Sequence, residues 1–134
     1  MALQYSTSVN NARLDSIEST IGTSPKLRLL TGTQPANCGT AQSGTLLVEI
    51  ALPSDWMAAA SSGSKAKSGT WTGTATGTGT AGYFRVVDSA GTTCHVQGDI
   101  TATGGGGTMT VDNTSVAANQ TVTVSTFTLT AANA

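Results

Sequence analysis

The chain has 134 residues and a mass of 13.4 kDa, which is the size of one domain with its own hydrophobic core. Charged residues make up 10% of it, against about 25% in an average soluble protein, and the formal net charge is -1. This charge balance excludes the basic surface with which proteins bind nucleic acid or an anionic membrane.

Threonine is the most frequent residue, and glycine contributes 16 residues. Threonine favours pleated strands and glycine favours tight turns, so the composition predicts an all-β domain. A surface this poor in charge suits a protein that is surrounded by other proteins in a large assembly. The first residues, "MALQYSTSVNNARLD", lack a basic stretch followed by an apolar run, so we expect synthesis and folding in a cytoplasm.

Residues 7–21 form the one expected helix, with hydroxyl residues to cap its start and Gly22 to end it. Its apolar residues recur at nearly helical spacing; they are Val9, Ala12, Leu14, Ile17 and Ile21. This stripe packs either on the domain's own sheet or on a neighbouring subunit. We divide the chain into an N-terminal arm and helix, residues 1–22, and a β-sandwich domain, residues 23–134.

From Pro25 onward the apolar pattern has the period of strands, separated by glycine, asparagine, serine and proline. The expected strands are residues 26–30, 45–52, 69–75, 83–88, 93–98, 99–103, 108–112 and 121–130. Seven or eight strands predict a jelly-roll-like β-sandwich with one N-terminal helix. Its expected core includes Val86, Val96, Ile100, Val111, Val124 and Phe127.

Two further features concern local geometry. In residues 121–130 the apolar residues stand at even positions up to Val124 and at odd positions from Phe127. A strand with one apolar face would need an extra residue between them, which predicts a β-bulge near Ser125 or Thr126. The segment "DSAGTT", residues 88–93, predicts a short hairpin turn in which Gly91 takes a positive φ.

Several apolar side chains fall outside the strand register that would fill a sandwich core. We expect them to make intermolecular contacts; they are Leu3, Tyr5, Val9, Leu14, Trp56 and Met57. Residues 53–69 are accordingly expected to form a mobile or partner-contacting loop. On this interpretation, residues 1–22 could be removed without unfolding the sandwich.

The stretch "CHVQGDITATGGGGTMTVDN", residues 94–113, contains residue types that occur in thiol active sites, metal sites and phosphate-binding loops. Neighbouring residues on a strand point to opposite faces, so Cys94 and His95 do not form a thiolate and base pair. His95 with Asp88 and Ser89 lacks a nucleophile elbow or an oxyanion-hole motif. The four glycines lead into a strand and no lysine follows them, so they predict a hairpin or crossover loop with unusual φ rather than a phosphate-binding loop.

Metal and cofactor sites are also not expected. Two cysteines and one histidine are too few for a zinc site, and the seven carboxylates lack the spacing of a calcium loop. We therefore predict no catalytic residues, no metal and no cofactor. Cys38 and Cys94 are expected to be reduced and buried, with a single disulfide as the alternative.

The segments "TAGYFRVVDSAGTTCHVQGDITATGGGGTMTVDNTSV", "MALQYSTSVNNARLDSIESTIGT" and "TVTVSTFTLT" resemble small virion structural proteins of tailed bacteriophages and prophages. The nearest role is that of the capsid decoration (cement) proteins with jelly-roll folds. This resemblance implies a protein made in the cytoplasm of a bacterial host and located in the virion. It implies a dimer or trimer that bridges the major capsid protein or other virion proteins.

Two alternatives stay open. Neck, collar and tail accessory proteins are built from similar sandwiches. The second alternative is a β-sandwich module that is displayed on a fibre and binds a host surface or a glycan. Only six aromatic side chains are available to stack against sugar rings.

Overall fold

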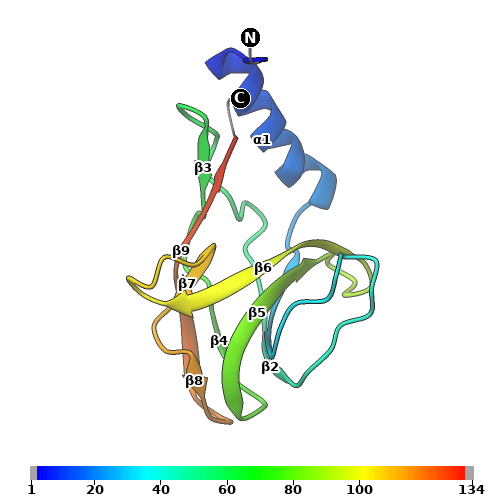
Figure 1. Cartoon of the computed structure of the whole chain (residues 1–134), viewed down its shortest axis with the longest axis vertical. Helices are drawn as coiled ribbons and strands as arrows, with labels where there is room; N and C mark the ends of the chain where they lie inside the picture. Colours follow the sequence, from blue (N-terminus) through cyan, green and yellow to red (C-terminus); the bar gives the residue numbers. More distant parts are fainter. Residues whose placement is uncertain (1–2, 132–134) are drawn as a thin grey trace.

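The computed structural model describes residues 3–131, and these residues form a mostly β fold with one helix (Figure 1). The elements are α1 (Thr7–Ile21), β1 (Lys26–Thr31), β2 (Leu46–Ala51), β3 (Ser64–Ala66), β4 (Thr72–Thr74), β5 (Gly79–Val87), β6 (Cys94–Ala102), β7 (Met109–Val111), β8 (Ser115–Val116) and β9 (Thr121–Thr130). The expected all-β, jelly-roll-like class is confirmed. The sequence analysis did not predict the short strands β3 and β8, and it predicted two separate strands where the structure has the single strand β6.

The strands belong to one curled sheet in the order β2-β1-β5-β6-β7-β9-β3, with β4 also paired to β9 and β8 to β5. All pairs are antiparallel except β6 with β7, which are parallel. The sheet curls so far that the segment after β4 meets β2. At this meeting point the backbone N–H groups of Thr76 and Gly77 donate to the carbonyl oxygen of Leu47 in β2. The curl encloses the hydrophobic core.

The core combines residues from both sides of this curl and from α1. Five of the six residues expected in the core are buried, and Val96 is partly buried against it. Four aromatic rings cross the core in a row: Trp56 and Trp71 have centroids 6.0 Å apart, Trp71 and Phe127 5.7 Å, and Phe127 and Phe84 5.5 Å. Aromatic contacts at these distances add to the stabilisation from buried area.

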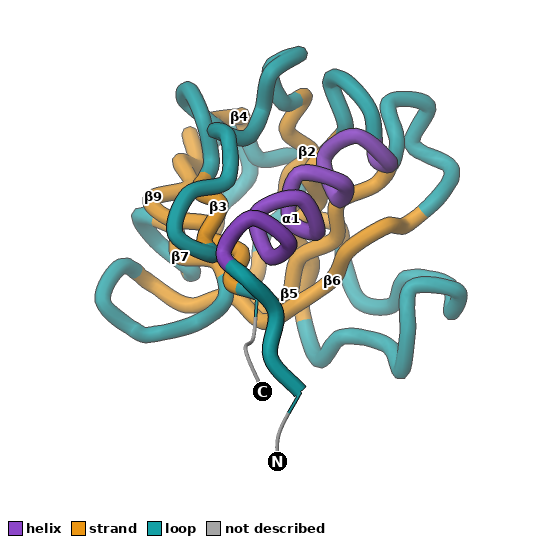
Figure 2. The backbone as a smooth tube through the Cα atoms, turned by 90° about the horizontal axis from the view of Figure 1, so that it is seen from above, coloured by secondary structure: helices purple, strands orange, loops and turns teal. Residues whose placement is uncertain are grey.

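Helix α1 lies across one end of the curled sheet, and β9 ends on the same side (Figures 1 and 2). Ser6 caps the helix by accepting a hydrogen bond from the backbone N–H of Val9, and Gly22 ends it with a φ of 91°. The caps expected from the sequence are therefore confirmed. The buried stripe differs from the expected one, because Asn10 is buried while Val9 and Ala12 are exposed.

Strand β9 contains the expected bulge. Thr110 pairs with Thr126 and Val111 pairs with Val124, so Ser125 is the extra residue. The bulge allows Val122 and Val124 before it, and Phe127 after it, to face the same core.

The four glycines form the connection between the parallel strands β6 and β7. Parallel neighbours usually need a crossover of a dozen or more residues, and here residues 103–108 suffice. Gly104 and Gly106 have φ values of 86° and 80°, and a Cβ on Gly105 or Gly107 would lie less than 3.0 Å from the Thr101 side chain. The expectation of a glycine loop with unusual φ is confirmed.

Candidate interaction surface

The exposed large apolar side chains of the described residues all lie near the N-terminus. They are Leu3, Tyr5 and Val9, which are 66%, 41% and 43% exposed. Tyr5, Val9 and Arg13 follow one another at intervals of four residues, and the Arg13 guanidinium lies 4.9 Å from the centre of the Tyr5 ring. We call Leu3, Tyr5 and Val9 the N-terminal apolar patch.

The patch extends from the residues before α1 to its first turn, and α1 is hydrogen-bonded to the rest of the fold. Asp15 Oδ1 accepts a hydrogen bond from the backbone N–H of Ala60 at 3.0 Å, and Asn11 Oδ1 accepts one from the N–H of Gly63 at 2.9 Å. The indole N–H of Trp56 donates to the carbonyl oxygen of Gly22 at 3.0 Å. These bonds join α1, from Asn11 to its C-terminal cap Gly22, to the segment between β2 and β3.

Three of the six residues expected at an interface are buried inside the chain instead. Leu14 is 4% exposed, and Trp56 and Met57 are each 1% exposed, so the expectation that they contact another molecule is wrong. The segment after β2 folds back beneath α1 and places Trp56 and Met57 in the core. Residues 53–69 therefore belong to the domain's own packing, whereas the exposed patch keeps the interface prediction for Leu3, Tyr5 and Val9.

Lys65 is the charged residue that holds α1 and β3 together, and its side chain is almost fully buried. Nζ donates to Asp15 Oδ1 at 2.8 Å and to the carbonyl oxygen of Ala58 at 2.8 Å, and it lies 2.7 Å from Glu18 Oε2. All three of its N–H groups thus have acceptors.

These contacts change the protonation equilibria of the pair. Burial by itself would lower the pKa of Lys65, but the hydrogen bonds to Asp15 and Glu18 outweigh burial and raise it. The same hydrogen bond, followed by that from Ala60, lowers the pKa of Asp15. Both groups therefore stay charged at neutral pH.

A second surface is formed by the loop between β1 and β2, residues 32–45, which covers the outer face of the sheet. It is the cyan loop beside β5 in Figure 1. The Tyr83 hydroxyl donates to the carbonyl oxygen of Ser43 at 2.6 Å, and Arg85 Nη2 donates to that of Thr40 at 2.7 Å. Strand side chains thus fix a long loop that has no regular structure of its own.

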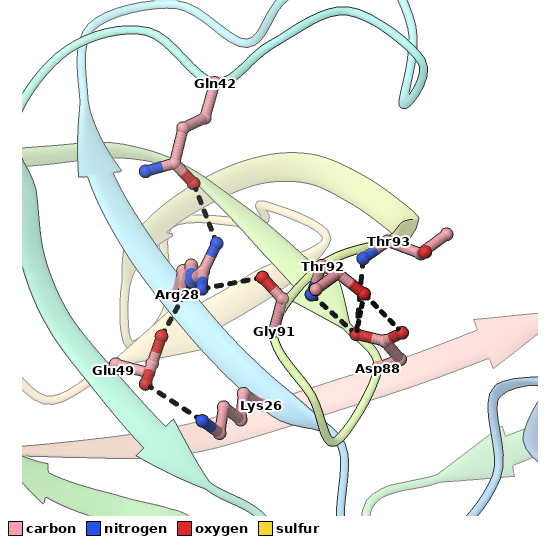
Figure 3. A network of polar contacts seen from close by, with 8 residues as sticks. All are labelled: Lys26, Arg28, Gln42, Glu49, Asp88, Gly91, Thr92 and Thr93. Atoms are coloured by element: carbon pink, nitrogen blue, oxygen red, sulfur yellow. Dashed lines mark hydrogen bonds and ion pairs between the residues drawn. The ribbon is translucent and has the colours of Figure 1, made fainter.

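Figure 3 shows the polar network at the exposed side of this face. Arg28 lies at its centre: Nε donates to Glu49 Oε2 at 2.7 Å, Nη1 to Gln42 Oε1 at 3.2 Å and Nη2 to the Gly91 carbonyl at 3.1 Å. The hydrogen bond from Arg28 lowers the pKa of Glu49. Lys26 Nζ lies 3.7 Å from Glu49 Oε1 and completes the network.

The side chains considered above as parts of a catalytic site are separated. Cys94 lines a hollow beneath the β1–β2 loop, whereas His95 lines another hollow beside α1. Asp88 accepts hydrogen bonds from the backbone N–H groups of Thr92 and Thr93 (Figure 3). These bonds lower the pKa of Asp88 and stabilise the hairpin turn in which Gly91 has the expected positive φ of 77°.

Within residues 3–131, no three His, Cys, Asp or Glu side chains lie close enough together to hold a metal ion. No helix in the same residues has the length and hydropathy needed to span a bilayer. The polar and charged side chains that are buried within the described residues are instead Asn10, Lys65, Arg85 and Thr110. Sequence reasoning missed Lys65 and Arg85 because their partners, Asp15 and the loop at Thr40, lie 50 and 45 residues away in the chain.

Comparisons of the chain with protein-family models, with curated proteins and with solved structures gave no match. The interpretation of its function therefore depends on the geometry described above.

Proposed function

We propose that this protein is a virion structural protein of a tailed bacteriophage, and most specifically a capsid decoration (cement) protein. In this role it bridges copies of the major capsid protein or other virion proteins, as a homo-oligomer, without a catalytic residue, metal or cofactor. It is made in the cytoplasm of the bacterial host and resides in the virion.

The observation that carries the proposal is the N-terminal apolar patch, Leu3, Tyr5 and Val9, just before and at the start of an anchored helix. Large exposed apolar side chains gathered in one short segment are typical of a contact with another protein. Each side chain buried in such a contact contributes about 1.5 to 3 kcal/mol. Many copies on a repeating lattice make even a small contact sufficient for attachment.

The rest of the surface supports the same role. With 6 basic and 7 acidic residues in the whole chain, the protein has little charge with which to keep neighbours apart. The long loop of residues 32–45 is held to the sheet by strand side chains, which gives a second preformed surface for contact with a neighbour.

The aromatic residues argue against the glycan-binding alternative. Sugar platforms need exposed aromatic rings, and five of the six here are buried. They are Trp56, Trp71, Tyr83, Phe84 and Phe127. The remaining ring, Tyr5, already contacts Arg13.

Mass spectrometry of purified particles from the host that carries the gene tests the proposal directly. We expect the chain in amounts comparable to the capsid protein, and localisation of the chain by cryo-electron microscopy on the capsid exterior. A location at the neck or tail would support the accessory alternative. Absence of the chain from particles would disprove a virion role.

A patch variant, Leu3→Ser with Tyr5→Ser and Val9→Ser, tests the observation itself. Its matched control is Gln4→Ser with Ser8→Ala and Ala12→Ser, which changes exposed neighbours on the same segment. We expect the patch variant, and not the control, to lose particle attachment or self-association by at least tenfold, measured by co-sedimentation and light scattering. Equal attachment of both variants would remove the patch from the interface.

A further inference from the structure

The two cysteines lie 56 positions apart in the sequence, and the fold brings them together on the outer face of the sheet. Cys38 belongs to the β1–β2 loop, residues 32–45, and its position is fixed from both sides. Gln97 Nε2 donates to the carbonyl oxygen of Pro35 at 2.7 Å, and Arg85 Nη2 donates to that of Thr40 at 2.7 Å. The backbone around Cys38 is thereby held against β5 and β6.

Cys94 reaches the same place because of a bulge at the start of β6. Val86 pairs with Val96 and Val87 pairs with Cys94, so His95 is the extra residue. Cross-strand partners share a face, so Cys94 lies with Val87 on the outer face and not with Val96.

Both cysteines line one hollow, together with Arg85 and Thr92. Both are free thiols and only partly exposed. The nearby Cys38 thiol contributes, after burial, to the raised pKa of Cys94, whose Sγ donates to the carbonyl oxygen of Val96 at 3.6 Å. Two neighbouring thiols on segments held by independent hydrogen bonds are placed for a covalent bond.

We propose that Cys38 and Cys94 form an intrachain disulfide when the folded protein meets a low-molecular-weight disulfide such as oxidised glutathione. Thiol–disulfide exchange proceeds in two steps. A Cys38 thiolate attacks the small disulfide, which forms a mixed disulfide and releases one reduced thiol. Cys94 then attacks the Cys38 sulfur and releases the second reduced thiol, so two protein thiols are oxidised and one small disulfide is reduced.

The order of these steps follows from the surroundings of Cys94. Burial, and after it the interaction with Cys38, raises the pKa of Cys94 to about 12. Cys94 is therefore a thiol at neutral pH and does not make the first attack. In the mixed disulfide the Cys38 thiol is consumed, and burial still raises the pKa of Cys94, so the second step is faster at higher pH.

The bond has a structural consequence for the surface loop. It closes a covalent ring from residue 38 to residue 94 and ties the β1–β2 loop to β6. Such a ring restricts the unfolded chain, and a rise in Tm on the order of 10 °C is expected. This inference is independent of the virion role proposed above.

The experiment starts from the fully reduced full-length chain, which is incubated with oxidised glutathione at several pH values and quenched with acid. Intact-mass and non-reducing peptide analysis identify the products. We expect a monomer lighter by about 2 Da in which the peptides containing Cys38 and Cys94 are linked. Cys94→Ser should instead accumulate a glutathione adduct at Cys38, while Cys38→Ser should react far more slowly.

Thermal unfolding of the oxidised and reduced chains completes the test. The Tm of the wild type should rise on oxidation, and that of Cys38→Ser with Cys94→Ser should not change. Stable glutathione adducts without a linked peptide, or disulfide-linked dimers as the main product, would overturn the proposal. So would a linked chain whose Tm is equal to or lower than that of the reduced chain.

Discussion

Lys65 donates a hydrogen bond from Nζ to Asp15 Oδ1 over 2.8 Å, and this contact joins strand β3 to the middle of helix α1. The two partners differ in their surroundings. The Lys65 side chain is 1% exposed, whereas that of Asp15 is 48% exposed. Removing one partner is therefore not equivalent to removing the other.

Lys65→Met should lower stability by about 1 kcal/mol or less, because methionine fills the site and the carboxylates of Asp15 and Glu18 can return to water. Asp15→Asn with Glu18→Gln should lower the Tm on the order of 10 °C, because it leaves a buried ammonium without a counter-charge. Thermal unfolding followed by circular dichroism measures both. A larger loss for Lys65→Met than for the double variant would contradict this account.

The same contact predicts a dependence of stability on pH. The pKa of Asp15 is lowered in the fold, so its contribution is present above about pH 4 and is lost as the pH falls through the lowered value. The pKa of Lys65 is raised, so its contribution is present below about pH 10 and is lost as the pH rises through the raised value. The Tm should thus be highest between these limits.

Tm measurements across the pH range in a Cys94→Ser background, which removes the ionisation of that thiol, test this dependence. Lys65→Met should flatten the alkaline fall and Asp15→Asn should reduce the acid fall. Identical pH profiles in all three proteins would show that the contact contributes nothing.

Removal of residues 1–22 should destabilise the whole domain, contrary to the expectation from the sequence. The deletion would remove the buried Leu14 and the core residue Ile21, leave the indole N–H of Trp56 without Gly22 and leave Lys65 without its carboxylates. Removal of residues 1–4 should leave the Tm within about 2 °C, since the Ser6 cap remains. A folded, soluble chain that begins at residue 23 would contradict this prediction.

The bulge in β9 can be tested by two single-residue deletions. Deleting Ser125 would remove the extra residue and leave Val124 and Phe127 two positions apart, on one face of a regular strand, so the chain should still fold and lose about 1 to 2 kcal/mol. Deleting Thr123 would instead move Val122 to the outer face of the strand, and we expect a loss of more than about 3 kcal/mol or failure to fold. Urea unfolding measures the difference, and similar losses would contradict the assignment of the bulge.

Gly82 occupies another bulge, between β1 and β5, where it lies against the backbone of Gly32. A Cβ at this position would overlap the Gly32 carbonyl oxygen, so Gly82→Ala should cost about 2 to 4 kcal/mol. Gly39→Ala is the matched control, because the nearest atom to its Cβ would be Asn37 Oδ1 at 3.1 Å in an exposed loop. Equal losses of unfolding free energy for the two variants, measured by urea unfolding, would contradict the close contact between Gly82 and Gly32.

Features that depend on neighbours in sequence were predictable from the sequence alone. The spacing of apolar residues and the residues at each end determined the helix Thr7–Ile21, the strand Thr121–Thr130 and the bulge at Ser125. The glycine run likewise indicated a loop with positive φ, because only glycine adopts that backbone without strain. Each of these rests on local sterics and on the period of one element.

The tertiary structure decided which side chains are covered and by what. Trp56 was expected at an interface and lies in the core, because a segment without strand periodicity folds back beneath α1. Lys65 is buried because Asp15, fifty residues earlier, neutralises it. Cys38 and Cys94 line one hollow because of a bulge and of a loop held by distant side chains. A sequence pattern shows which face a residue occupies, but the burial of that face depends on segments far away in the chain.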